Sequence, residues 1–189
     1  MVELLGTIDV GLKRLGRTAT IQMLQPGLPA SECYKTLETL ELDASGDLAT
    51  IYAWHNGTST TDGVVLDDLH LFPGFYFLSL QEAVANYVAF KGDDRWDPSW
   101  LPVFGNGGGD FFVVVCDRDL KEWGQVVHFR IDESEHPLEF ASIEAMLATV
   151  AAAYEEGVYY VDDRGYLEMD DYSYIALATR MNGDAGYWR

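Results

Sequence analysis

The chain has 189 residues and is 48% hydrophobic, which is enough for one well-buried core and too little for two full-sized domains. Its 31 acidic and 12 basic residues give a formal charge of −19. Such a negative field repels DNA, RNA and anionic lipid and attracts cationic partners, so nucleic acid is not expected as a ligand.

Two helices are predicted in the first third of the chain. Cys33, Leu37 and Leu40 indicate a short helix after the Gly and Pro residues at 27–29. In 47–55, apolar residues and a histidine recur at helical spacing and form one stripe: Leu48, Ile51, Tyr52 and His55. Asn56-Gly57 is a usual helix stop, so a loop is expected there.

Two further helices have clear start signals. Ser79 and Glu82 have the spacing of a capping box, and an apolar face follows it at Leu80, Ala83, Val84, Tyr87 and Val88. A helix that begins at Ser142 is predicted from the stripe Ile143, Met146, Leu147, Val150 and Tyr154, and Gly157 ends it.

Strand patterns lie between and after these helices. Residues 111–116 are continuously apolar, as in a strand covered on both faces, and 127–131 alternate as in a half-exposed neighbour joined by a turn at 121–124. Residues 158–161 and 166–169 predict a hairpin. Because helices and antiparallel strands occur in separate blocks, the sequence predicts a single α+β domain over residues 1–189, with a mainly antiparallel sheet.

The run GNGGGD at 105–110 raises the question of a phosphate-binding loop. A dinucleotide fingerprint places its glycines after a strand and before a helix, whereas this run leads into a strand and lacks the spacing of GxGxxG or of a P-loop. We therefore interpret it as a tight turn in which Asp110 caps loop amides.

Catalytic and metal-binding patterns are not visible. The four histidines show no metal-ligand spacing, and Cys33 and Cys116 are far apart in apolar surroundings typical of buried reduced thiols. Cys116 is an unsuitable nucleophile because five bulky apolar residues precede it. No enzymatic activity, cofactor or metal is expected. The chain shows no signal peptide and no run of roughly 20 apolar residues, so we expect a cytoplasmic protein with no membrane association.

The order of several motifs resembles the SUKH superfamily, which includes the Smi/Knr cell-wall assembly regulators. The matching residues are Trp96, Asp97, Pro98, Trp100, Leu101, Pro102, Phe104, Gly107, Gly108, Gly109, Asp110, Asp117, Gly124, Gln125 and Val126. Leu48, Tyr52, Asn56 and Gly57 are similar to its helix and Asn-Gly loop, and Ala141, Ser142 and Leu147 to the start of its last core helix. The resemblance covers mainly 48–147, and Ile143 departs from the family's usual phenylalanine.

The resemblance implies an α+β fold without known enzymatic chemistry. Many bacterial members resemble immunity proteins that bind and block a toxin, and fungal relatives act as interaction modules in cell-wall signalling. The expected function is therefore toxin neutralisation by protein binding, with a scaffold or regulatory role in cell-envelope assembly or signalling as the alternative. The oligomeric state stays open.

Charge agrees with a cationic toxin domain as the partner, because dense carboxylates steer association with a basic protein. Acidic doublets occur at 67–68, 93–94, 155–156, 162–163 and 170–171. The candidate partner contacts are Asp67, Asp68, Asp93, Asp94, Trp96 and Asp97. For each doublet, a merely solvated face is the competing interpretation, and core packing is favoured for Trp96 and Trp100.

Overall fold

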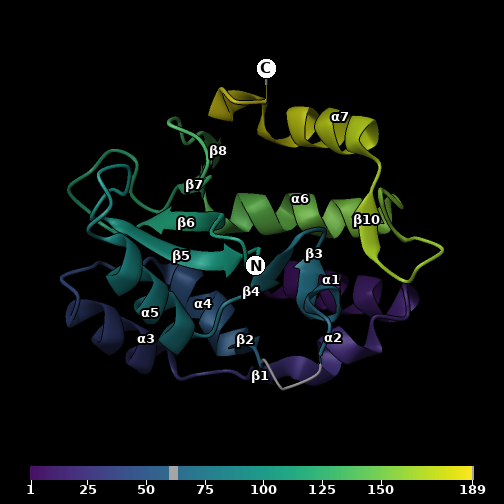
Figure 1. Ribbon diagram of the computed structural model, residues 1–189, viewed down its shortest axis with the longest axis horizontal. Helices are drawn as coiled ribbons and strands as arrows, with labels where there is room; N and C mark the ends of the chain where they lie inside the picture. The colour runs from purple at the N-terminus through teal and green to yellow at the C-terminus, as the bar shows by residue number, and fades with distance from the viewer. Residues whose placement is uncertain (60–63, 189) are drawn as a thin grey trace.

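The computed structural model describes residues 1–59 and 64–188, and the described part of the chain has an α+β fold (Figure 1). The N-terminal elements are α1 (Val2–Arg14), α2 (Thr18–Met23), β1 (Leu24–Pro26), α3 (Ala30–Glu38), α4 (Gly46–Trp54) and β2 (His55–Thr58). Strands β1 and β2 pair with each other in a small antiparallel sheet. No helix in the described ranges is long and apolar enough to cross a membrane.

The main sheet has six strands, which lie in the order of the chain. They are β3 (His70–Phe72), β4 (Phe75–Phe77), β5 (Trp100–Gly105), β6 (Phe111–Val115), β7 (Val126–Phe129) and β8 (Leu138–Phe140). All neighbouring pairs are antiparallel, which confirms the predicted sheet type. Every residue of β6 is buried, as its continuous apolar sequence predicts.

Helices cover both sides of this sheet. They include α5 (Leu80–Phe90), which packs on β5, and α6 (Ile143–Glu155), which packs against α1 and α7 (Asp171–Asn182). Figure 1 shows α6 between α1 and α7. Between α6 and α7, the strands β9 (Tyr159–Val161) and β10 (Leu167–Met169) form the predicted hairpin. Short 3₁₀ turns, η1 (Leu66–Leu69) and η2 (Gly183–Ala185), precede β3 and follow α7.

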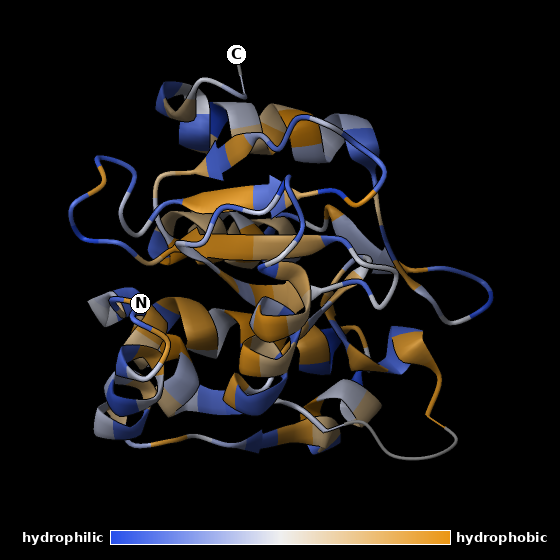
Figure 2. Cartoon of the chain, turned by 60° about the vertical axis from the view of Figure 1, so that its left-hand side comes forward, coloured by the Kyte–Doolittle hydropathy of each residue, from blue (hydrophilic) through white to orange (hydrophobic). Residues whose placement is uncertain are grey.

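One hydrophobic cluster connects the elements from Leu5 in α1 to Trp188 after η2. Figure 2 shows hydrophobic residues concentrated on the central strands and hydrophilic ones on the connecting loops. Gly11 permits a close approach of α1 to α6, because a Cβ atom at this position would lie 2.5 Å from Cγ of Tyr154. Sequence analysis did not predict α1, in which Gly6 and Gly11 interrupt the apolar pattern.

The predicted local signals are mostly confirmed. Both halves of the capping box are present, since the Ser79 hydroxyl accepts from the Glu82 amide at 3.2 Å and the Glu82 carboxylate accepts from the Ser79 amide at 2.9 Å. One prediction is wrong: 55–57 is not a helix end and loop, because α4 stops at Trp54 and His55 begins β2. The His55 ring nitrogen Nδ1 lies 2.8 Å from the carbonyl oxygen of Gln25 in β1, so the side chain supports strand pairing.

Candidate protein-binding surface

The Trp-Pro motif that precedes β5 is packed into the interior. Trp96 is only 4% exposed, and its ring lies 4.9 Å from that of Phe129 and 5.4 Å from that of Phe90, measured between centroids. The Tyr87 hydroxyl donates to the Pro98 carbonyl, and the half-buried Trp100 ring contacts Trp96. The structure therefore gives Trp96 a packing role and does not present its ring to a partner.

Proline and glycine positions shape the turns around the central strands. Pro102 lies within β5, where the register with β6 shifts between Pro102 and Phe104. In the turn to β6, Gly107 and Gly109 have positive φ, and a Cβ at Gly109 would lie 2.6 Å from the Cδ1 atom of Ile131. The backbone at Gly109 therefore requires a glycine.

Asn106 and Asp110 hold this glycine turn together. The side-chain oxygen of Asn106 accepts from the amides of Gly108 and Asp110, and the Asp110 carboxylate accepts from the Ile131 amide at 2.8 Å. Asp110 thus caps a loop amide, although the loop is the one that follows β7. These contacts occupy the polar groups of the turn and support its interpretation as a structural element.

The turn between β6 and β7 uses Asp117 and Gly124. The Asp117 carboxylate accepts from the Asp119 amide at 2.9 Å, and Gly124 has φ +81 while its amide donates to Val115. Both residues stabilise the predicted reversal between the two strands.

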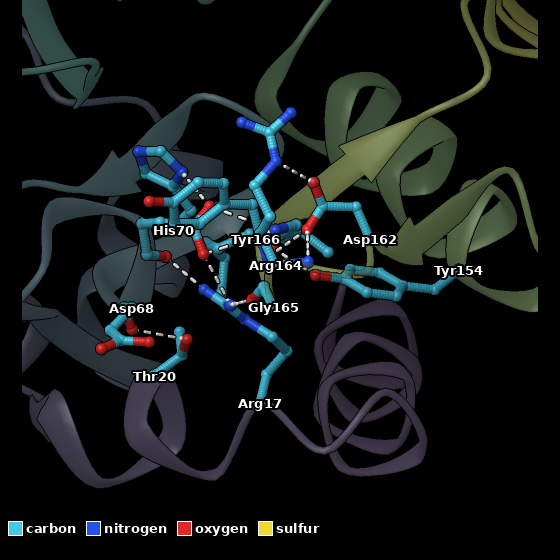
Figure 3. Close-up of polar contacts among 12 residues, drawn as sticks. Arg17, Thr20, Asp68, His70, Tyr154, Asp162, Arg164, Gly165 and Tyr166 are labelled. Atoms are coloured by element: carbon cyan, nitrogen blue, oxygen red, sulfur yellow. Dashed lines mark hydrogen bonds and ion pairs between the residues drawn. The ribbon is translucent and has the colours of Figure 1, made fainter.

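Asp67 and Asp68 lie in η1. Asp67 accepts from the buried Arg17 side chain at 2.7 Å and from the Leu167 amide at 3.1 Å. The Asp68 carbonyl accepts from Thr20, and Figure 3 shows this pair next to the contact between Arg17 and Gly165. Burial lowers the pKa of the neighbouring His70, whose Nδ1 lies 3.3 Å from the Asp67 carboxylate. The Asp67 carboxylate is used internally, between the N-terminal helices and the β9–β10 hairpin.

Asp93, Asp94 and Asp97 lie in the connection from α5 to β5. Asp93 binds the Arg95 guanidinium through both carboxylate oxygens, at 2.8 and 3.0 Å, and these hydrogen bonds lower the pKa of Asp93 to about 2. Asp97 accepts from the Ser99 amide and hydroxyl, and Asp94 is exposed. Arg95 also donates to the Ile131 carbonyl, so this segment contacts the loop between β7 and β8.

That contact brings two acidic segments together, and sequence analysis identified only the first. Residues 92–99 and 131–137 contain one lysine or arginine, Arg95, whose charge is paired with Asp93. We call the acidic side chains of these two segments the acidic loop surface: Asp93, Asp94, Asp97, Asp132, Glu133 and Glu135. All except Asp93 are exposed. The signal for the second segment was its composition, but sequence alone does not show which loops meet.

The other acidic doublets occupy element ends. The Glu156 carboxylate at the end of α6 accepts from Arg180 in α7, and the Asp162 carboxylate accepts from the amides of Arg164 and Tyr166 in the β9–β10 turn. Asp170 is the N-cap of α7, where its carboxylate accepts from the Ser173 amide at 2.8 Å. Each doublet is therefore partly explained by local structure.

Both cysteines are free and buried, and burial raises the pKa of Cys33 to about 11 and raises that of Cys116 further. Within the described ranges, no group of three or more His, Cys, Asp or Glu side chains is placed to hold a metal ion. Neither cysteine has the exposure or the lowered pKa of a reactive thiol.

A cavity of about 390 Å³ that sequence analysis missed lies between the main sheet and α7. Aromatic side chains from both sides line it, including Phe75, Phe112, Tyr174, Tyr187 and Trp188. His128, Arg130 and Glu139 also line it, and Glu139 contacts both of the others. Its closest sequence signal was the alternation in β7, which places His128 and Arg130 on the face opposite Phe129.

Comparison with known protein families gives one match over the centre of the chain. The model of the SMI1 / KNR4 family (SUKH-1) matches residues 38–149. A comparison with curated proteins found no match. The matched segment runs from the end of α3 into α6 and includes the whole six-stranded sheet, whereas α1, the β9–β10 hairpin and α7 lie outside it.

Proposed function

The chain belongs to the SMI1 / KNR4 family (SUKH-1), and from this premise we propose that it is a non-catalytic binding protein that neutralises a cationic toxin domain through an acidic face. Membership of this family fits an immunity or a regulatory protein. The formal charge of −19 favours a basic partner, because opposite charge accelerates association.

The observation that carries the proposal is the acidic loop surface. Asp94, Asp132, Glu133 and Glu135 are exposed, and their carboxylates accept no hydrogen bond from any described residue. The single arginine of the two segments forms an ion pair with Asp93 and also interacts electrostatically with Asp132. This surface therefore offers a basic protein exposed carboxylates that accept no hydrogen bond from the described residues, as the phosphate groups of a nuclease substrate would.

Co-expression tests the proposal. The expected toxin is a short basic domain at the end of a large reading frame beside this gene. Cells that produce this domain together with the chain should survive, and cells without the chain should die. Equal killing in both cultures would overturn the immunity function, and would favour a scaffold role if deletion of the gene alters cell shape.

A matched pair of variants tests the surface. Asp94→Asn, Asp132→Asn, Glu133→Gln and Glu135→Gln together remove four exposed negative charges and should weaken toxin binding about tenfold or more. The control carries Glu3→Gln, Glu32→Gln, Glu38→Gln and Glu122→Gln, which make the same change in net charge at other exposed positions. If both variants bind the toxin equally well in titration calorimetry, the acidic loop surface is not the binding face.

A further inference from the structure

The cavity beneath α7 contains a buried carboxylate. Glu139 is 4% exposed, and its Oε1 atom accepts from Arg130 at 3.3 Å and lies 3.0 Å from Nδ1 of His128. Its Oε2 atom accepts no hydrogen bond from a described residue and is not among the fully buried unpaired atoms, so it is open to the cavity. A carboxylate oxygen that faces the cavity without a partner from the protein is an acceptor available to a ligand there.

The Arg130 guanidinium in the lining is engaged by neighbouring side chains through one nitrogen. One of its nitrogens, Nη2, donates both to Glu139 and to the Tyr187 hydroxyl, the latter at 3.0 Å. A second carboxylate, that of the exposed Asp171 at the start of α7, lines the cavity as well. The lining thus holds two carboxylates, one guanidinium and the His128 imidazole, so with a neutral imidazole the cavity favours a positive charge over a negative one.

The aromatic walls favour the same kind of ligand. Phe72, Phe75 and Phe112 lie on the sheet side, and Tyr174, Tyr187 and Trp188 lie on the side of α7 and η2. Ring faces attract cations through their quadrupoles, and several rings around one space form the arrangement that proteins use to hold ammonium and guanidinium groups. Phe75, Tyr174 and Tyr187 are only partly buried, which leaves ring surface open to a ligand.

Acidic and aromatic residues also occur on the surface next to the cavity. A neighbouring hollow of about 510 Å³ shares Pro73, Met169 and Asp171 with the cavity and is also lined by Glu168. On α7, Ile175 lines the cavity and is 54% exposed, and Tyr172, which follows the lining residue Asp171, is 87% exposed. Exposed aromatic and aliphatic residues beside carboxylates are typical of a protein interface with a central anchor pocket.

We infer that the cavity between the sheet and α7 binds a cationic side chain, arginine or lysine, that a basic protein partner inserts beside Glu139. The inference rests on the proposed function in that it assumes a basic protein as the partner. The covering helix α7 lies beyond residue 149, where the match to the family ends, so this anchor pocket would be a feature of this chain's own C-terminal segment.

Small probes test the pocket without the toxin. The full chain is titrated with N-acetyl-L-arginine N-methylamide and, as a neutral control of the same shape, with N-acetyl-L-citrulline N-methylamide. Chemical shifts are followed for the Trp188 indole N–H, which donates to the Glu139 carbonyl at 2.7 Å, and for the Tyr174 and Tyr187 rings. The arginine probe should shift these signals and bind about tenfold more tightly than the citrulline probe. Equal binding of the two probes, or shifts only at other positions, would overturn the inference.

Two substitutions with opposite expected effects give the sharper test. Glu139→Gln leaves Arg130 as an uncompensated cation and should weaken arginine-probe binding at least about fivefold. Arg130→Met frees Glu139 for the ligand and should strengthen binding of the arginine probe. The inverse pattern would show that the cavity takes an anion and would overturn the inference. A two-dimensional amide spectrum checks that each variant is folded, and a variant that unfolds is replaced by Asp171→Asn, for which weaker binding is likewise expected.

The outcomes separate the two proposals. If the chain does not protect cells in the co-expression test but binds the arginine probe as expected, toxin neutralisation is rejected and the inference about the pocket stands. If the chain protects cells but does not prefer the arginine probe over the citrulline probe, the inference about the pocket is rejected and the immunity function stands.

Discussion

The Arg17 guanidinium is buried, and the carboxylate of Asp67 balances its charge at a distance of 2.7 Å. The arginine is 6% exposed and lies just before α2, whereas Asp67 lies in η1 and also accepts from the Leu167 amide in β10. One ion pair thus connects three parts of the chain that are distant in sequence. Asp68, the adjacent residue, contributes only its carbonyl oxygen to this network, so the two aspartates differ sharply in their structural roles.

We expect Asp67→Asn to destabilise the fold by about 3–5 kcal/mol, because it removes the negative partner of a buried cation. Urea denaturation measures the change in the free energy of unfolding. Asp68→Asn is the matched control and should change stability by less than about 0.5 kcal/mol, since its carboxylate has no hydrogen bond within the described ranges. Equal effects of the two substitutions would contradict this assignment.

The contact of β2 with the start of α5 depends on Asn56 and Gly57. The Asn56 side chain accepts from the Leu80 amide at 2.9 Å and donates to Gln81 at 3.1 Å, so it supplements the capping box of α5. Gly57 has φ +72, and a Cβ there would lie 2.1 Å from the Ser79 amide nitrogen. The Asn-Gly pair therefore positions one element against another.

At this junction, Gly57→Ala should lower the free energy of unfolding by more than about 2 kcal/mol, because both the positive φ and the contact with the Ser79 backbone exclude a methyl group. Gly46→Ala is the comparison. Gly46 is the first residue of α4, where a Cβ meets nothing within 4 Å, so stability should stay the same or rise by roughly 0.5 kcal/mol. Thermal unfolding followed by circular dichroism gives both values. A small loss at Gly57 would mean that β2 can move away from α5.

Elements with local signals were predictable from the sequence, and elements defined by their neighbours were not. The capping box at Ser79 and the apolar run of β6 act within a few residues, so the pattern identified both. The β3–β4 hairpin was missed although its strands are as long as those of β9 and β10 and Pro73-Gly74 between them is a turn signal, and Pro102 obscures β5. Helix α7 has buried residues only at Leu177, Ala178 and Asn182, because much of its surface faces solvent.

At the scale of the whole molecule, both candidate binding regions arise from segments that are distant in sequence. The acidic loop surface forms because Arg95 contacts Ile131. The anchor pocket forms because α7 covers the face of the sheet that carries His128. Sequence analysis identified Asp93, Asp94 and Asp97 as candidates but assigned Asp67 to the same role, although the structure uses it elsewhere. The net charge of the chain indicated a basic partner. The positions of the two candidate binding regions could be found only from the fold.

The net charge leads to a prediction about the rate of complex formation. With a formal charge of −19, the chain attracts a basic partner over a distance set by screening, which falls from about 30 Å at 0.01 M salt to about 3 Å at 1 M. The association rate constant with the toxin should therefore fall by at least about tenfold between 0.02 and 0.5 M NaCl, and the dissociation rate constant should change much less.

Surface plasmon resonance gives both rate constants, and two controls make the result specific. The variant that neutralises the acidic loop surface should show a shallower dependence on salt than the variant with four substitutions elsewhere, because charges near the contact contribute most to steering. The free chain should become more stable as salt rises, because screening relieves its self-repulsion, so slower association cannot be attributed to unfolding. An association rate that stays constant across this range would show that charge does not guide the encounter.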